Sequence, residues 1–160
     1  MYMIHGDASC EPFHPDGILA WAFIVKLKGK IVHQDVHISG WGKGCTVNIG
    51  EYQAVLGALM WLCSLPLSER KPAVIHSDSQ LIVNQCKGIY GCKADNLIPL
   101  LDLVKRAKKR YRKTIFFKWI PREQNGEADA LSRSLYTEEA LAVMKKHHMD
   151  ILFDGDDLPW

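Results

Sequence analysis

The stretch Ala73-Val74-Ile75-His76-Ser77-Asp78-Ser79-Gln80 places a carboxylate directly after a short apolar run. The run is flanked by turns, which predicts a buried strand that leads into Asp78, and a short helix is expected over 79–87. His76 falls in the buried strand, where a hydrogen-bonded core role is expected. In α/β sheets, sites form in the crevices outside strand ends, so this stretch predicts both an α/β fold and a site at Asp78.

Three more segments place a carboxylate where an apolar stretch meets a break: His5-Gly6-Asp7-Ala8-Ser9, Asn48-Ile49-Gly50-Glu51 and Asn125-Gly126-Glu127-Ala128-Asp129. Asp7 is expected to leave a first strand over 1–5, next to the strand that leads into Asp78. Glu51 and Asp129 are expected near the starts of helices, where the helix dipole favours anions. A single acid of this kind is ordinarily a cap or a surface residue. Four together predict a shared site that needs cations, and oxygen ligands favour magnesium or manganese.

The periodicity of the remaining chain predicts one α/β domain with a mixed sheet. Strands are expected over 18–27, 31–39 and 115–120, with a hairpin at 28–30. Helices are expected from 49 to before Pro66, and over 97–111, 128–135 and 137–147. The order β-β-β-α-β-α-α-β-α is that of a single domain, and 160 residues suffice for one core.

Composition excludes several classes of protein. No apolar run approaches the roughly 20 residues that span a bilayer, so no membrane association is expected. The five cysteines are scattered without a CxxC pair, which predicts neither a zinc site nor disulfides and favours a reducing, cytoplasmic setting. The net charge is only +2, but basic residues crowd one predicted helix: Lys105, Arg106, Lys108, Lys109, Arg110, Arg112 and Lys113. They form either a solvated helix face or a phosphate-contacting patch.

The segments around the four acids resemble type 1 ribonuclease H, from about Ile4 to Leu135. The stretch Trp119–Ser132 resembles the W-x-P-R-E-x-N-x-x-A-D-x-L-[AS] signature of the archaeal and plant-like branch, which lacks the histidine loop. The resemblance implies a ribonuclease H-like fold, with a five-stranded mixed sheet of order 3-2-1-4-5 flanked by helices. An extra C-terminal helix and tail would follow, giving a catalytic domain over 1–149 and an acidic tail over 150–160.

The same resemblance implies an endoribonuclease that hydrolyses the RNA strand of RNA/DNA hybrids. Its catalytic and metal-binding residues would be Asp7, Glu51, Asp78 and Asp129, with two Mg²⁺ ions per site and Mn²⁺ as a substitute. Asp7, Glu51 and Asp78 would hold the ion that stabilises the leaving 3′-oxygen. Asp7 and Asp129 would share the ion that presents the attacking water. The products would carry 5′-phosphate and 3′-hydroxyl ends.

Matching positions also imply substrate contacts. Backbone groups at Ser9 and Cys10 would meet RNA riboses, and Thr46 would touch a DNA phosphate. Asn48 would contact the 2′-hydroxyl side of the hybrid, which distinguishes RNA from DNA, and Gln80 would meet a minor-groove base edge. Tyr90 would offer an aromatic surface to the DNA strand. Asn48 as a helix N-cap and Tyr90 as a packed loop residue remain open as alternatives.

Three departures from the family pattern stand out. Ala8 replaces the usual glycine after the first acid, and no histidine occurs between Pro121 and Asp129. The segment 87–95 is also short for the basic protrusion of some bacterial members, which leaves the basic helix over 105–113 as a substitute source of positive charge.

Two alternatives to the hybrid-cleaving enzyme remain at this point. One is another nuclease of the ribonuclease H-like superfamily, of the resolvase or integrase kind, and the other is a catalytically idle nucleic-acid-binding module. The tail Asp154–Trp160 resembles the acidic tip of bacterial single-stranded-DNA-binding proteins, which predicts a replication or repair partner. A disordered or self-packed terminus is the alternative for the tail.

Overall fold

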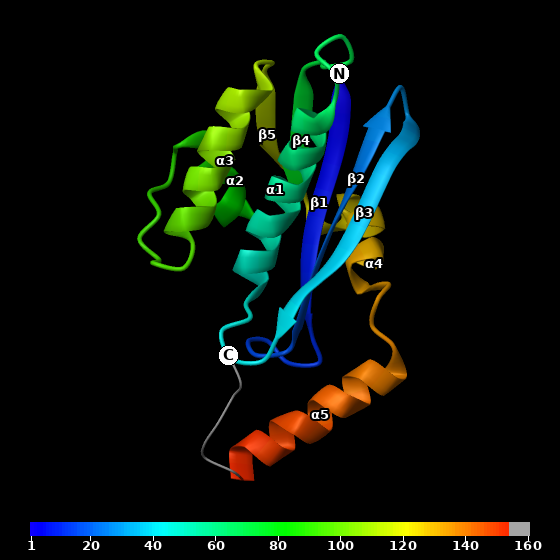
Figure 1. The fold of residues 1–160 in the computed structure, drawn as a ribbon, viewed down its shortest axis with the longest axis vertical. Helices are drawn as coiled ribbons and strands as arrows, with labels where there is room; N and C mark the ends of the chain where they lie inside the picture. The colour runs from blue at the N-terminus through cyan, green and yellow to red at the C-terminus, as the bar shows by residue number, and fades with distance from the viewer. Residues whose placement is uncertain (154–160) are drawn as a thin grey trace.

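The computed structural model describes residues 1–153 and contains one five-stranded sheet with helices around it (Figure 1). The strands are β1 (Tyr2–Glu11), β2 (Ile18–Leu27), β3 (Lys30–Trp41), β4 (Ala73–Ser77) and β5 (Ile115–Trp119). The helices are α1 (Val47–Ser64), α2 (Gln80–Lys87), α3 (Ile98–Tyr111), the 3-10 turn η1 (Arg122–Gln124), α4 (Gly126–Arg133) and α5 (Glu138–Phe153). Each of the five strands and five α-helices lies where a predicted range falls, although the predicted order β-β-β-α-β-α-α-β-α omits the last helix and η1 was not expected.

The strands lie in the order β3-β2-β1-β4-β5, which confirms the expected mixed sheet of order 3-2-1-4-5. β1, β2 and β3 pair antiparallel, whereas β4 pairs parallel with both β1 and β5. The expectation that Asp7 leaves the first strand is wrong, because β1 continues to Glu11 and Asp7 pairs with Ala22 of β2. It is β4 that stops, because its register with β1 ends where His5 lies opposite His76. Beyond His5, β1 pairs with no strand on that side among residues 1–153.

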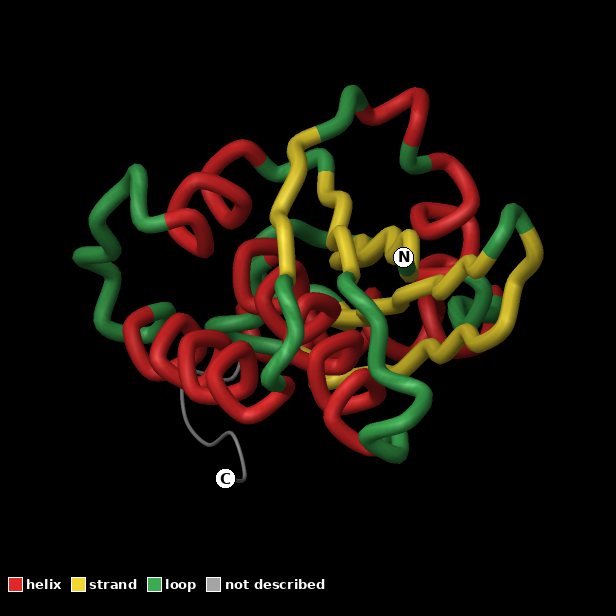
Figure 2. Tube along the Cα trace, turned by 90° about the horizontal axis from the view of Figure 1, so that it is seen from above, coloured by secondary structure: helices red, strands yellow, loops and turns green. Residues whose placement is uncertain are grey.

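One face of the sheet carries the main hydrophobic core under α1, and α3 packs against α1 (Figure 1). Tyr52, Val55, Leu59 and Leu62 are each at most 2% exposed, so the helical spacing of apolar residues marks the buried face of α1 correctly. They meet Tyr2, Ile4, Phe23, Val25 and Ile75 from the strands. Figure 2, turned by 90°, shows the strands as a twisted layer with helices around it.

The opposite face of the sheet is covered by α4, which contacts β1 and β2. The buried Ser9 of β1 donates a hydrogen bond to the carbonyl of Ser132 at 3.2 Å. α5 follows, with the Thr137 hydroxyl accepting from the Ala140 amide at 3.0 Å as an N-cap, and it crosses the predicted boundary at residue 149. The predicted tail, Asp154–Trp160, lies outside the described residues. Within residues 1–153, no helix combines the length and apolarity needed to cross a membrane.

Candidate active site

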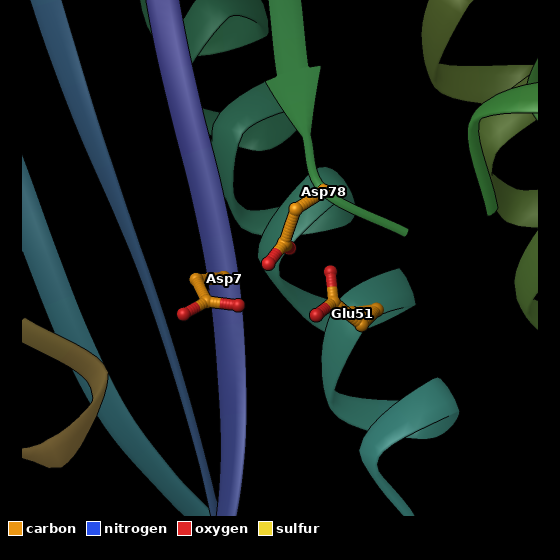
Figure 3. Close-up of side chains that lie close together, drawn as sticks. All are labelled: Asp7, Glu51 and Asp78. Carbon is orange, nitrogen blue, oxygen red and sulfur yellow. The ribbon is translucent and has the colours of Figure 1, made fainter. Parts of the chain in front are cut away.

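The site forms where β1 runs past the end of β4 (Figure 3). Asp7 lies in the middle of β1 and is 4% exposed, while Asp78 follows directly after β4. Because these two parallel strands are neighbours in the sheet, the end of β4 brings Asp78 beside Asp7, as the sequence predicts. His76, two residues before Asp78, is buried, and its Nδ1 lies 3.1 Å from the Ile4 carbonyl oxygen. This confirms the predicted role of His76 as a hydrogen-bonded core residue.

The first turns of α1 add the third carboxylate because a glycine lets the helix approach β1 closely. A Cβ atom on Gly50 would lie 2.6 Å from the Cβ of Ala8 and 2.8 Å from a methyl carbon of Leu19, so only glycine fits without movement. Ala8, which stands where the family usually has glycine, is therefore part of this tight contact. The adjacent Glu51 is 4% exposed and points toward Asp7 and Asp78 (Figure 3).

One oxygen each of Asp7, Glu51 and Asp78 lies within 4.8 Å of the other two. Two side chains orient this carboxylate triad. The hydroxyl of Ser77 donates to Glu51 Oε2 at 3.1 Å. The amide of Asn125, a residue 1% exposed, donates to the Gly6 carbonyl at 3.0 Å and to Asp78 Oδ1 at 3.5 Å. These hydrogen bonds fix the positions of the Glu51 and Asp78 carboxylates and limit how far they can move apart.

The electrostatics of the triad are those of crowded, buried acids. Burial, and then the charge of Asp78, raise the pKa of Asp7 to about 7. Burial, followed by the charges of Asp7 and Asp78, also holds the pKa of Glu51 well above its usual range. Three oxygen donors that repel one another fit a hard divalent cation, since a cation at this position favours the ionised form of every member. The residues present therefore suit magnesium or manganese.

The fourth predicted acid, Asp129, lies outside the 4.8 Å group and has arginine partners. It occupies the first turn of α4, as expected, and its Oδ1 lies 3.1 Å from Arg133 Nε and 3.7 Å from Arg122 Nη2. Arg133 also pairs with Glu11, at the end of β1, at 2.5 Å. Asp129 is still near enough for its charge to raise the pKa of Asp7. The structure thus places three acids together and the fourth beside them in an ion pair.

A cleft of about 380 Å³ opens over the triad. Its lining includes Ser9 and Cys10, both predicted to meet RNA riboses, and His14, Ser79, Arg122 and Arg133. Ser9 and Cys10 are buried, and the carbonyl of Ser9 accepts a hydrogen bond from Tyr136 at 2.9 Å. The predicted contacts therefore lie at the cleft wall.

The other predicted substrate residues lie at the starts of α1 and α2, next to residues of the cleft lining, and in the loop after α2. Thr46 is the N-cap residue of α1 and the exposed Asn48 follows in its first turn, so the alternative of Asn48 as the N-cap is wrong. Gln80, also exposed, begins α2 directly after Ser79 at the cleft wall. Tyr90 lies beyond the end of α2 and is 47% exposed, which leaves its ring accessible.

Three supporting residues of the site escape sequence reasoning. Asn125 stands inside the signature segment, but only the fold shows that its amide bridges Gly6 and Asp78. Ser77 and Arg133 are similar cases: a serine before an acid and an arginine four residues after one are common patterns. The i to i+4 spacing of Asp129 and Arg133 on a predicted helix was the one available signal.

A mixed sheet of this order, with a carboxylate triad where its central strand passes the end of β4, defines the ribonuclease H class of fold. A family model described as Reverse transcriptase-like matches residues 16–135, three quarters of the chain. The chain therefore belongs to this family, and its resemblance to type 1 ribonuclease H is confirmed. The match includes Glu51, Asp78 and Asp129, whereas Asp7 precedes it.

Solved structures of ribonucleases H superpose on most of the chain. LC11-RNase H1, isolated from compost by a metagenomic approach and solved with an RNA/DNA hybrid, has 25% identity and a TM-score of 0.75 over 84% of this chain and 95% of its own. The N-terminal RNase H domain of Rv2228c from Mycobacterium tuberculosis has 20% identity and a TM-score of 0.73, over 92% and 97%. RNase H1 of the halophilic archaeon Halobacterium salinarum has 21% identity and a TM-score of 0.72, over 83% and 95%. The last two likenesses concern the fold alone.

Proposed function

We propose that this protein is an endoribonuclease that hydrolyses the RNA strand of RNA/DNA hybrids, leaving 5′-phosphate and 3′-hydroxyl ends. The observation that carries the proposal is the oriented triad of Asp7, Glu51 and Asp78 at the base of an open cleft. The likeness to LC11-RNase H1, which was solved with an RNA/DNA hybrid, supports the choice of substrate.

The carboxylates divide into two overlapping sets in this proposal. Asp7, Glu51 and Asp78 would hold one divalent ion, and Asp7 would share a second with Asp129, which is paired with Arg133. Magnesium, with manganese as a substitute, supplies an acidified water and neutralises charge on the scissile phosphate. Ser77 and Asn125 keep Glu51 and Asp78 in place, so the carboxylates need little rearrangement.

The cleft edges supply the substrate contacts. Thr46 and Asn48 stand on either side of Val47, a residue of the cleft lining, and would meet a DNA phosphate and the 2′-hydroxyl side of the hybrid. Gln80 follows Ser79 of the lining and would meet a base edge. The backbone at Ser9 and Cys10, also in the lining, would meet the RNA riboses, and Tyr90 would offer its exposed ring to the DNA strand.

Cleavage of labelled RNA/DNA, RNA/RNA and DNA/DNA duplexes with magnesium, manganese or chelator tests the function. We expect cleavage of the hybrid alone, only with a divalent ion. Asp78→Asn is expected to abolish cleavage and keep hybrid binding, because it removes a charge from the triad and leaves the cleft intact. A DNA junction is included as a fourth substrate, and its cleavage in preference to hybrid would indicate the superfamily alternative. Hybrid binding without cleavage by the wild type would indicate a binding module.

The proposal extends to the setting and the partners of the protein. The cysteine thiols, all free, suit a reducing cytoplasm. A replication or repair protein as partner rests only on the sequence of Asp154–Trp160, which lies outside the described residues. Deleting this tail and finding the same partners in a pull-down would remove that proposal.

A further inference from the structure

α3 ends at the same end of the molecule at which β4 begins (Figure 1), and the basic residues lie in and after the last turns of α3. β4 runs from Ala73 to Ser77, and Asp78 follows its end. At its beginning, the Ala73 amide donates to the carbonyl of Thr114 at 3.0 Å, just after α3 has ended at Tyr111. Asp78 comes five residues after Ala73, and at about 3.3 Å per residue the two lie roughly 16 Å apart. The basic residues are therefore not part of the cleft over the triad.

A hollow of about 720 Å³ forms at this end of the molecule. Its lining consists of five basic residues and one leucine: Leu67, Arg70, Arg106, Lys109, Arg110 and Arg112. No acidic residue lines it. Within α3 the single acid is Asp102, which lies 3.6 Å from Lys105. Among the residues whose side chains are described, none of the lining cations has an acidic partner within 4.0 Å.

The ordinary explanation of such a cluster is that cations balance the negative end of a helix. Here Arg70 already performs that task. Its guanidinium donates to the carbonyls of Tyr111 at 3.1 Å and Arg110 at 3.4 Å, and to those of Cys63 and Leu65 at the end of α1. The other four lining cations have no such contact, and Arg106 lies more than a turn from the helix end. Their charges face solvent in one concave surface.

We propose that Arg106, Lys109, Arg110 and Arg112 form a second phosphate-binding surface, which holds nucleic acid outside the segment that lies in the active-site cleft. The proposal rests on the proposed function, because the molecule in the cleft is then the one whose flanking part reaches this surface. Concavity and clustered positive charge suit a sugar-phosphate backbone, which such surfaces bind irrespective of sequence. The surface would retain the protein on long substrates and leave the chemistry at the triad unchanged.

Substrate length separates this surface from the cleft. At no more than about 3.4 Å per base pair, the rise of B-form DNA, a hybrid of about 8 base pairs centred on the acids extends at most about 14 Å to either side. A hybrid of about 30 base pairs extends up to about 50 Å, which is long enough to reach the hollow. The test measures binding of both hybrids by fluorescence anisotropy with EDTA present. It compares the wild type with Lys109→Gln/Arg110→Gln, and with Lys28→Gln/Lys30→Gln, which removes the same charge from the exposed β2–β3 hairpin.

We expect the Lys109→Gln/Arg110→Gln variant to bind the long hybrid about three- to tenfold more weakly, with the slope of log Kd against log salt lower by about 1 to 2. Its affinity for the short hybrid and its melting temperature should match the wild type, and the hairpin variant should bind both hybrids normally. Equal losses on both hybrids, an equal loss in the hairpin variant, or no loss would each overturn the proposal. Because binding is measured without divalent ions, a length-dependent loss supports the surface even if the wild type cleaves no hybrid.

Discussion

Replacing Asp7 with asparagine is expected to stabilise the fold in the absence of divalent ions. The pKa of Asp7 is raised from 3.8 to about 7, so the folded state binds this proton more tightly than the unfolded state. Stability is therefore lost as the pH rises from about 4 to about 7, and the loss is complete above pH 7. At about 1.4 kcal/mol per pH unit the difference amounts to about 4 kcal/mol. Because Glu51 shares the repulsion, we expect a gain of about 2–4 kcal/mol from Asp7→Asn at pH 8.

Thermal and urea unfolding in EDTA measure this gain. For a chain of this size it corresponds to a melting temperature higher by roughly 5–15 °C. The advantage should be nearly lost by about pH 4 and should vanish near pH 3, where Asp7 is mostly protonated in both states. Magnesium should raise the melting temperature of the wild type and leave that of the Asp7→Asn variant almost unchanged, because a ligand stabilises only a folded state that binds it.

Asp95→Asn, in an exposed loop, is the control and should change the free energy of unfolding by less than about 0.5 kcal/mol. An Asp7→Asn variant that is less stable than the wild type at pH 8, or equally stabilised at pH 8 and at pH 3, would refute the reasoning.

Three further predictions concern the residues around the triad. Asn125→Ala removes the amide that donates to Asp78 and Gly6, so the free energy of unfolding, measured with urea, should fall by about 1–3 kcal/mol. Single-turnover cleavage by this variant should slow, while its affinity for hybrid stays unchanged. Arg133→Gln removes the partner of Asp129, so cleavage should slow and its magnesium dependence should shift, with recovery in Arg133→Lys; a normal magnesium titration would contradict this role. Gly50→Ala forces a Cβ into the β1 and β2 side chains, and urea unfolding should show a loss of about 1–3 kcal/mol.

The surface at the end of α3 changes how the basic segment of the sequence is understood. From sequence alone, this helix was a candidate replacement for the missing basic protrusion, and so a part of the grip on the hybrid near the cleft. Its position at the beginning of β4 separates it from the triad by the length of that strand. The proposed role of this helix is to hold nucleic acid outside the cleaved segment.

The sequence by itself determined the type and order of the elements and the candidate acids. Apolar residues at helical or alternating spacing report which face of one element is buried, and this is a local property of the chain. The periodicity therefore predicted the buried face of α1 and the short strand β4 correctly. The carboxylates at element boundaries, together with the resemblance of their segments to type 1 ribonuclease H, pointed to the triad.

Only the tertiary structure decided how far apart these groups lie. Asp7 sits in mid-strand, and it becomes part of a site because β4 stops beside it. Asn125 reaches Gly6, 119 residues away in the chain, and Asp129 is paired with Arg133 and set apart from the triad. Such distances follow from the register between strands and from the depth at which helices pack on a sheet. Contacts between distant segments fix both, and no local periodicity records them.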